Sequence, residues 1–533
     1  MNKTWKKRIS LVTAVLIMLS SLAGCGGDAS NNQPATTPSS GGGDAQPTAV
    51  GSNDFIYASP SEPMTMDPHY ITEPVSGKIM CQIHEQLFIR NEQSEIVPLL
   101  AESAETSEDG LTWTIKLKEG VKFHNGDPFN AEAVKYTFDR LLDPATASPK
   151  ASALQGVTKI ETDGDYKVVF TLSAPNLVFL ANLTNYTTAI INPKVAEEYG
   201  IDRYGEHPVG TGPLKLESWD RGIEMTLVKN EDYHGEEPTV DRLVIKFVKE
   251  EANRIMMIKS GDADIAAAIP PIQVPDLEQD PNVKVISTPG YRVMYLGINN
   301  AKPPFDDQRV RLAAAYAINK QQIIDNILKG MALYPSGMWS PAIQYAATDL
   351  DPHEQDLEKA KALLAEAGFP DGFKTTLTTS NGSYAMDTQI VQAVQSMLAE
   401  AGIDAEIINM DYGAYNDILD YGTGDELDLY WLGKGCSTGD PEFDMTLYLL
   451  KDGAQNFSNY NNDEVDAMVR KLPDCKDLEE REALLHEIQK IHNDDVNIVP
   501  VYYETQITAT KSNVEGLVVY PNELIRLAYL TRT

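Results

Sequence analysis

The first folded segments are marked by apolar residues at every second position. The clearest run is Leu111, Trp113, Ile115 and Leu117. Because side chains alternate between the two faces of a strand, this spacing predicts a half-buried strand. Similar runs predict further strands at 166–172, 225–228 and 243–248.

A helix is predicted after the turn signal Asn125-Gly126-Asp127. Asn130 is of a residue type that caps helix N-termini. Val134, Phe138 and Leu141 then fall on one helix face, which predicts that this face is buried.

Strands and helices alternate between residues 356 and 431. The predicted helices are 356–367, 387–401 and 413–421, and the predicted strands are 374–379, 405–408 and 427–432. Gly368 and Gly402 follow the first two helices, in the position where glycine commonly ends a helix. This alternation predicts right-handed crossovers, a mostly parallel sheet and an α/β fold class. Helices at 461–472 and 477–493 and strands at 498–503, 507–510 and 517–520 complete the pattern.

The N-terminal segment is typical of a secretion signal. Lys3, Lys6, Lys7 and Arg8 precede a largely apolar stretch at 9–21. Because this stretch is shorter than the roughly 20 residues that span a bilayer, a signal peptide at 1–24 is predicted. Leu22-Ala23-Gly24-Cys25 resembles the bacterial lipobox, which implies cleavage before Cys25 and acylation of its thiol. The alternative is an ordinary signal peptide with a coincidental cysteine.

Residues 26–52 are almost free of large apolar side chains and rich in Gly, Ser, Pro, Thr and Asn. Such a composition cannot bury enough apolar surface to offset the loss of chain entropy on folding. We therefore expect 25–52 to be a lipid-anchored flexible tether with a reach of roughly 30 Å.

The formal net charge of −34 limits the possible partners. Such an acidic chain repels phosphate backbones and anionic headgroups, so no nucleic-acid binding is expected and membrane contact depends on the lipid. Besides Cys25 the chain has Cys81, Cys436 and Cys475. These allow at most one disulfide, whose pairing stays open.

Two common sequence motifs of catalysis and metal binding are absent. The chain has no G-x-x-x-x-G-K-[ST], and His84-Glu85 lacks the second histidine of H-E-x-x-H. The histidines and cysteines show no close ligand spacing. We therefore predict no catalytic residue, no cofactor and no metal, and interpret the chain as a binding protein and not an enzyme.

Three other motifs have structural interpretations. The glycines of Gly210-Thr211-Gly212-Pro213 suit a tight turn before a strand, and the isolated His124 suits a packed side chain. Arg309 and Arg311 open a helix, and we expect them to pair with nearby carboxylates such as Asp306 and Asp307 rather than to contact a ligand.

Several segments, in order along the chain, carry a resemblance to a known family. They include Ser61-Glu62-Pro63-Met64-Thr65-Met66-Asp67-Pro68-His69, Ile96-Val97-Pro98-Leu99-Leu100-Ala101-Glu102-Ser103, Gly120-Val121-Lys122-Phe123-His124-Asn125-Gly126, Ser260-Gly261-Asp262-Ala263-Asp264 and Pro304-Phe305-Asp306-Asp307-Gln308-Arg309-Val310-Arg311. Together they resemble the family 5 extracytoplasmic solute-binding proteins, which serve ABC importers and include dipeptide-, oligopeptide- and nickel-binding members.

The resemblance implies a two-lobed periplasmic-binding-protein clamshell of type II, in its large family 5 form. One lobe would be 54–289 plus 503–533 and the other 290–502, with hinge crossings near Gly290 and Tyr502. It also implies a lipoprotein on the extracytoplasmic face of the membrane, periplasm-facing or at the cell surface. We expect a monomer that captures a peptide-like solute and delivers it to an ABC permease and ATPase complex.

The ligand-binding residues are predicted from the same resemblance. In peptide-binding relatives an Asp before an acidic-Pro pair receives the α-ammonium of the peptide, and Ser437 stands in that place here. A Ser hydroxyl cannot neutralise a buried ammonium, so Asp440 is a second candidate. The stretch around Tyr384 has no Arg for a peptide carboxylate, which weakens the case for short, doubly anchored peptides.

Aromatic and acidic residues complete the predicted site. Tyr70 and Glu73 follow the opening strand, Trp339 lies in a Pro- and Gly-rich loop, and Trp431 ends a predicted strand. Each is also compatible with packing in the core. The alternatives left open are a non-peptide solute, such as an opine, a glycan or a metal chelate, and a sensor lipoprotein that presents its ligand to a receptor.

Overall fold

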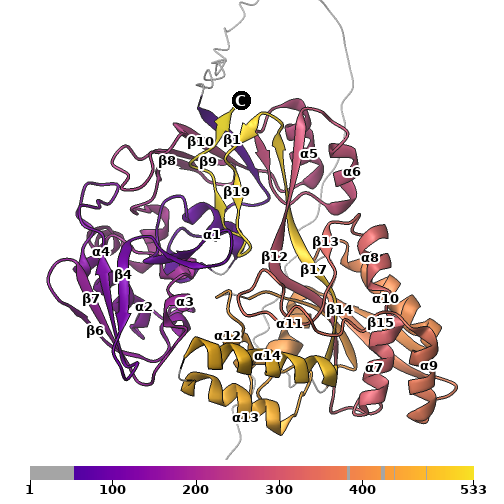
Figure 1. The fold of residues 1–533 in the computed structure, drawn as a ribbon. Coiled ribbons are helices and arrows are strands. Elements are labelled where there is room, and N and C mark those ends of the chain that lie inside the picture. The colour runs from indigo at the N-terminus through magenta and orange to yellow at the C-terminus, as the bar shows by residue number, and fades with distance from the viewer. Residues whose placement is uncertain (1–52, 72, 381–383, 422–425, 437, 476) are drawn as a thin grey trace, which may run out of the picture. The chain divides into compact units, whose positions relative to one another are not determined.

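Two long strands, β12 (Val283–Ile298) and β17 (Ile498–Lys511), run side by side through the structure (Figure 1). They pair antiparallel from Val283 opposite Lys511 to Gly297 opposite Ile498. The computed structural model describes residues 53–71, 73–380, 384–421, 426–436, 438–475 and 477–533. The predicted signal peptide, Cys25, the tether and Ser437 lie outside these residues.

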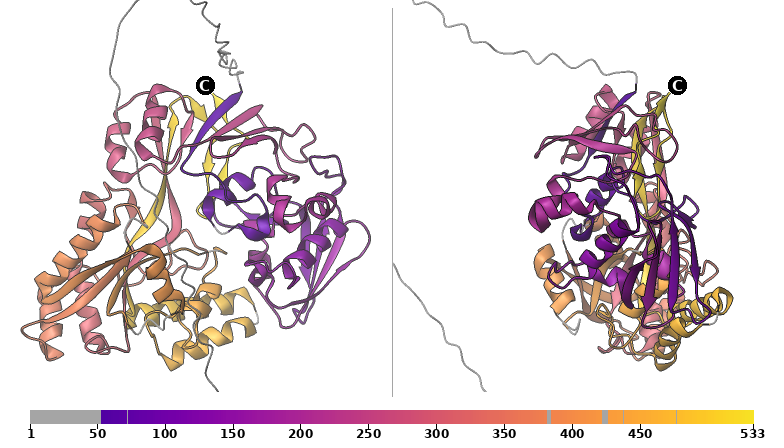
Figure 2. Two further views of the ribbon diagram at one scale, coloured as in Figure 1. Left: turned by 180° about the vertical axis from the view of Figure 1, so that it is seen from behind. Right: turned by 90° about the vertical axis from the view of Figure 1, so that its left-hand side faces the viewer.

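An 11-stranded sheet extends from both sides of this pair. Beyond β17 the order is β11 (Ile265–Ala266), β1 (Asp54–Ser59), β10 (Arg242–Phe247), β9 (Glu224–Lys229) and β8 (Leu214–Asp220). Beyond β12 it is β16 (Leu429–Lys434), β14 (Phe373–Ser380) and β15 (Ile403–Met410), while β13 (Ala332–Leu333) pairs with β17. The reverse view in Figure 2 shows β12 and β17 connecting the two parts of the sheet.

The alternating segment forms as predicted. Strands β14, β15 and β16 are mutually parallel in the order β15-β14-β16. Helices α9 (Leu357–Glu366) and α10 (Asp387–Ala401) are followed by Gly368 and Gly402, whose φ angles of 96° and 105° are left-handed. The predicted α/β class is confirmed, but the sheet as a whole is mixed, because β12 is antiparallel to both β16 and β17.

Helices cover both faces of the sheet around β12. Met294, Leu296 and Ile298 share a core cluster with α7 (Gln308–Ala317), α9 and α10. The alternate positions Val293 and Tyr295 share a second cluster with α12 (Pro441–Tyr448), α13 (Asp463–Lys471) and α14 (Leu478–Asp495). A strand buried on both faces needs a continuous apolar run, which the second half of β12 provides.

A four-stranded antiparallel sheet stands apart from the large one in Figure 1. Its order is β4 (Ala101–Thr106), β5 (Thr112–Leu117), β7 (Lys167–Leu172) and β6 (Val157–Thr162). The predicted helix is α2 (Ala131–Leu142), capped by Asn130, whose side chain accepts from the backbone N–H of Ala133 at 3.1 Å. Its apolar face, including Phe138, is buried against this sheet.

The remaining elements are short. The helices are α1 (Pro74–Met80), α3 (Phe179–Asn182), α4 (Pro193–Arg203), α5 (Glu251–Ser260), α6 (Val274–Leu277), α8 (Lys320–Asn326) and α11 (Tyr412–Tyr421). Three strand pairs are β2 (Phe88–Arg90) with β3 (Ile96–Pro98), β18 (Val514–Glu515) with β21 (Thr531–Arg532), and β19 (Val518–Val519) with β20 (Ile525–Arg526). Within the described residues, no helix has the length and apolar character needed to span a bilayer.

Some sequence predictions need correction. The strands predicted at 498–503 and 507–510 are one continuous strand, β17, because pairing with β12 continues through the residues between them. Arg309 pairs with Asp307 as expected, but Arg311 donates to the backbone carbonyls of Asp495 and Val496. Cys81, Cys436 and Cys475 are all free thiols.

Candidate functional site

A cavity of about 240 Å³ lies between segments that are far apart in the sequence. Its lining includes Pro74, Lys150 and residues 184–187 from the first half of the chain. It also includes Tyr291 on β12 and the loop that follows β16. The cavity is therefore built where the neighbouring strands β12 and β16 meet segments from the first half of the chain.

A larger cavity of about 640 Å³ adjoins the first one. Arg292 and Glu523 line both cavities. Tyr384 and Tyr502 also line the larger cavity. We treat the two as one candidate site, with Arg292 and Glu523 at their junction.

The junction is an ion-pair cluster across β12 and β17. Arg292 contacts Glu504 at 3.1 Å and Glu523 at 3.2 Å, and Lys78 lies 3.8 Å from Glu523. Burial raises the pKa of Glu504, and the positive charge of Arg292 opposes this shift. Each charge at the junction therefore has an opposite charge beside it, which is what partial burial of such groups requires.

The loop after β16 is held from both sides. Arg90 donates from Nε to the carbonyl oxygen of Thr438 at 2.7 Å. Lys434 pairs with the buried Asp444 at 3.3 Å, and Cys436 donates from Sγ to the carbonyl oxygen of Asp440 at 3.3 Å. These contacts fix the part of the loop that lines the smaller cavity.

Two of the predicted site residues lie beside the loop. Tyr384 lines the larger cavity, with its ring 6.0 Å from the guanidinium of Arg292. Asp440 is 3% exposed; it caps α12 through the N–H of Glu442 and pairs with the buried Arg481 at 2.6 Å. Its carboxylate is therefore engaged within the fold. Ser437, between them in the predicted site, is outside the described residues.

The other predicted residues line neither cavity. Tyr70 donates to the carbonyl oxygen of Thr146, and Glu73 accepts from the N–H of Met64. Trp339 packs beside His492 in one core cluster, and Trp431 packs in another, with Tyr502 alongside. The structure thus places Tyr384 in the candidate site and Glu73 one residue before Pro74 at its edge.

Sequence reasoning missed Arg90, Lys150, Tyr186 and Arg292 as lining residues. Arg292 stands two residues after Gly290, where the hinge crossing was predicted, so its position offered a signal. Arg90 ends β2, and Lys150 and Tyr186 lie in segments without a recognisable binding motif. Their convergence depends on the tertiary fold alone.

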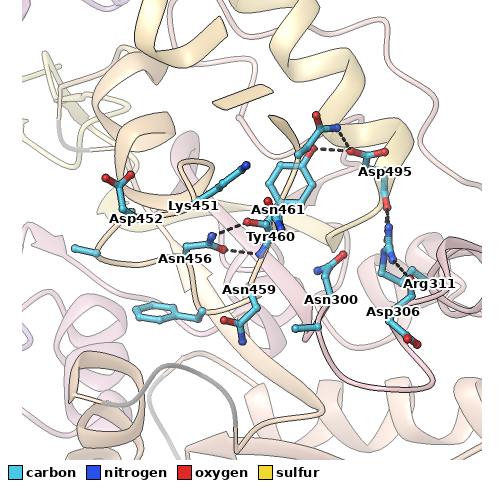
Figure 3. Close-up of a pocket in the computed structure, with 15 residues that line it drawn as sticks. Asn300, Asp306, Arg311, Lys451, Asp452, Asn456, Asn459, Tyr460, Asn461 and Asp495 are labelled. Carbon is cyan, nitrogen blue, oxygen red and sulfur yellow. Dashed lines mark hydrogen bonds between the residues drawn. The ribbon is translucent and has the colours of Figure 1, made fainter. Parts of the chain in front are cut away.

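A third cavity, of about 860 Å³, lies where β12 ends and β17 begins (Figure 3). Its lining comes from residues within 300–311 and 451–462 and from Asp495. Asp495 accepts from Tyr460 at 2.6 Å and from Asn462 at 2.7 Å, and Asn456 donates to the carbonyl oxygen of Tyr460 at 2.8 Å. Lys451 and Asp452 pair with Asp463 and Arg470, so the charged groups of this cavity are engaged within the fold, and we interpret the cavity as structural.

Comparison with known proteins gives one family match. The family described as "Bacterial extracellular solute-binding proteins, family 5 Middle" matches residues 95–456. The glutathione-binding protein GsiB of Shigella dysenteriae serotype 1 (strain Sd197) is 30% identical over 482 residues, which are 89% of this chain and 93% of GsiB.

Two solved structures with bound molecules are similar to this one. The periplasmic binding protein DppA of Helicobacter pylori, in complex with the peptide STSA, has a TM-score of 0.73 and 29% identity, covering 89% of this chain and 98% of DppA. The protein AgaA of A.tumefacien R10, in complex with agropinic acid, has a TM-score of 0.72 and 27% identity, covering 89% and 98%.

Proposed function

This chain belongs to the family 5 bacterial extracellular solute-binding proteins, and from that premise we propose that it captures a peptide or peptide-like solute and delivers it to an ABC permease. Proteins of this family are the binding components of ABC importers, and the relatives above are named as binding proteins and not as enzymes. In this proposal Cys25 carries a lipid anchor, residues 26–52 form the tether, and the permease with its ATPase supplies the energy.

Capture is proposed to occur by closure of two lobes, 54–289 plus 503–533 and 290–502. The chain passes from one to the other near Gly290 and returns near Tyr502. In support, the ladder between β12 and β17 shifts register between Pro289 and Val293, and again between Met294 and Tyr295. Such irregularities interrupt the hydrogen-bond ladder and are natural places for a hinge.

The observation that carries the proposal is the position of the two adjoining cavities. Both are lined by residues from each proposed lobe, and they meet at Arg292 and Glu523 beside the register shifts. Volumes of about 240 and 640 Å³ suit a ligand of a few residues. A solute bound there would contact both lobes and so favour the closed form.

The solute is tested by identifying what co-purifies with the protein. We expect mass spectrometry of the mature chain to find short peptides, and added peptides to raise its melting temperature. Lys451→Ala, which removes a charged side chain from the third cavity, is the control, and we expect it to leave this stabilisation unchanged. A protein that carries nothing and is not stabilised by any peptide pool would overturn the proposal.

The anchor is tested separately from the solute. We expect Cys25→Ser to move the protein from the membrane fraction to the soluble fraction. Cys475→Ser, which replaces a free thiol of the folded part, is the matched control and stays with the membrane. Delivery is tested by uptake of the identified solute, which we expect to fail in a strain that lacks this protein.

A non-peptide solute is the second candidate. AgaA was solved with agropinic acid, so proteins of similar structure also hold ligands that are not peptides. Among the described residues, the one carboxylate that lines the smaller cavity is Glu523, and it already pairs with Arg292. The carboxylate of Glu523, the kind of group that usually pairs with a peptide ammonium, is therefore already engaged. A single small molecule in the co-purified material would favour this candidate. Import of the solute that persists in a strain without this protein would instead favour the third alternative, a sensor lipoprotein that presents its ligand to a receptor.

A further inference from the structure

The smaller cavity is positively charged, although the chain as a whole is strongly negative. Its lining includes Arg90, Lys150, Arg292 and Lys434, against the one described carboxylate of Glu523. The formal net charge of the chain is −34. Four positively charged side chains around one cavity of an acidic protein therefore call for a specific explanation.

Two of the four cations are neutralised within the fold. Arg292 pairs with Glu504 and Glu523, and Lys434 pairs with Asp444. The cavity's excess charge therefore comes from Arg90 and Lys150.

Arg90 has no carboxylate partner in the described part of the chain. It is 4% exposed, and it donates to uncharged acceptors, which are the backbone carbonyls of Thr438 and Ser94 and the side chain of Gln344. Its Nη2 atom is buried without a hydrogen-bond partner. A buried guanidinium without a counter-charge is costly, and an anionic ligand in the adjoining cavity would lower that cost.

Lys150 supplies the second uncompensated charge. It is half-buried and forms no ion pair with any described residue, and burial lowers its pKa while the carboxylate of Glu73 opposes that shift. Its backbone is fixed, because its N–H donates to Ser148 at 3.1 Å and Ser148 donates to the carbonyl oxygen of His69 at 2.7 Å. The ammonium is thus carried by an ordered loop.

Tyr186 adds an uncharged donor to the same cavity. Its ring packs closely over Gly77, where an added Cβ would lie 3.1 Å from the ring. Burial raises the pKa of its hydroxyl to about 12, so the hydroxyl keeps its proton at neutral pH. It lines the cavity together with Lys150 and Arg90.

We propose that the smaller cavity binds an acidic group of the captured solute, held by Lys150 and Tyr186, with the buried guanidinium of Arg90 in the cavity wall contributing its unpaired charge. This inference rests on the proposed function and specifies the class of solute, which carries a carboxylate or a comparable anion. Charge-assisted hydrogen bonds are the strongest contacts that such a cavity can offer, and the one carboxylate among its described lining residues, Glu523, is already paired with Arg292.

The test compares acids with their amides on the full mature protein. The probes are glutathione, its form with both carboxylates converted to carboxamides, the tetrapeptide Ser-Thr-Ser-Ala and its C-terminal carboxamide, and calorimetry measures the dissociation constants. We expect at least one acid to bind about tenfold or more tightly than its amide. Lys150→Met removes this preference, while Lys118→Met, a half-buried lysine outside both cavities, retains it.

The outcomes separate the two proposals. Equal binding of acids and amides by the wild type, or an unchanged preference in Lys150→Met, overturns the anionic subsite but leaves solute capture standing. If the wild type binds none of the four probes and carries nothing when purified, capture itself fails, and the subsite fails with it. A wild-type preference for acids that weakens steeply with added salt supports the electrostatic origin.

Discussion

Arg90 and Thr438 lie 348 positions apart, yet Nε of Arg90 donates to the carbonyl oxygen of Thr438 at 2.7 Å. Two further hydrogen bonds run in parallel, from Arg90 to Gln344 at 3.0 Å and from Ser94 to the carbonyl oxygen of Ala342 at 2.7 Å. Arg90 and Ser94 belong to the hairpin of β2 and β3, whereas all three acceptors lie within 290–502. The hairpin therefore joins the two proposed lobes.

Removing the Arg90 side chain tests whether this hairpin holds the lobes together. We expect Arg90→Ala to increase the radius of gyration of the ligand-free protein in small-angle scattering, because two charge-assisted hydrogen bonds, each worth about 1.5–3 kcal/mol, are lost. Arg221→Ala, on an exposed turn, is the control. An unchanged radius in Arg90→Ala would show that the hairpin does not restrain opening.

Asp440 tests whether a predicted ligand-binding residue has a structural role. Its carboxylate pairs with Arg481, which is 1% exposed, and caps α12. Asp440→Ala leaves the buried guanidinium short of one of its two counter-charges, so we expect the free energy of unfolding to fall by about 3–5 kcal/mol in urea titrations. Asp404→Ala, at an exposed pair with Lys374, should change it little. Weaker solute binding at unchanged stability would instead assign Asp440 to the ligand.

The fold could be predicted where local pattern and tertiary environment agree. The bounds predicted for α10, 387–401, are those observed, because its apolar face repeats with the helical period and Gly402 ends it. β12 was not predicted, since half of it is buried on both faces and the alternation that signals a strand is lost. Its antiparallel pairing with β17 brings together residues more than 200 positions apart, which no local pattern records.

The candidate site could be predicted less well than the fold. Resemblance directed attention to the end of β16 and the loop after it, where Lys434 and Thr438 do line the smaller cavity. It gave no indication of Arg90, Lys150 or Tyr186, because each reaches the cavity from a separate segment. Aromatic side chains were a poor guide, since Trp339 and Trp431 pack in the core clusters as large apolar groups usually do.

Lys320 gives the protein a specific dependence of stability on pH. The residue is 2% exposed, its ammonium donates to the carbonyl oxygen of Pro352, and burial lowers its pKa from 10.5 to about 7. Between these two values the unfolded chain binds the proton and the folded chain does not. The contribution to stability is therefore fully present above the unfolded pKa and is lost as the pH falls towards 7.

Replacement of Lys320 by methionine should abolish this dependence. Relative to Lys320→Met, we expect the wild type to gain roughly 1.4 kcal/mol of unfolding free energy per pH unit between about pH 7.5 and pH 9. Denaturant titrations at three pH values measure the difference, and Lys329→Met, at an exposed lysine, is the control. Parallel pH curves for wild type and Lys320→Met would contradict the assignment.

Gly210 shows a structural role for the Gly210-Thr211-Gly212-Pro213 motif, which the sequence assigns to a tight turn. An added Cβ at Gly210 would lie 2.0 Å from the carbonyl oxygen of Ile83, and at Gly212 it would lie 2.7 Å from the same atom. These glycines thus permit a close approach of two backbone segments, where the N–H of Gly212 donates to Ile83 at 2.9 Å. An added Cβ at Gly210 would thus clash with backbone atoms of Ile83, and these cannot rotate away as a side chain would.

We therefore expect Gly210→Ala to lower the free energy of unfolding by about 1–3 kcal/mol or more, as overpacking of a dense region does. Gly435→Ala is the matched control, because a Cβ there meets nothing within 4 Å and its φ is not left-handed. Thermal and denaturant unfolding of both variants measure the difference. Equal stability would mean that the segment carrying Gly210 shifts away from Ile83 at little cost, and the close approach would then not explain the glycine.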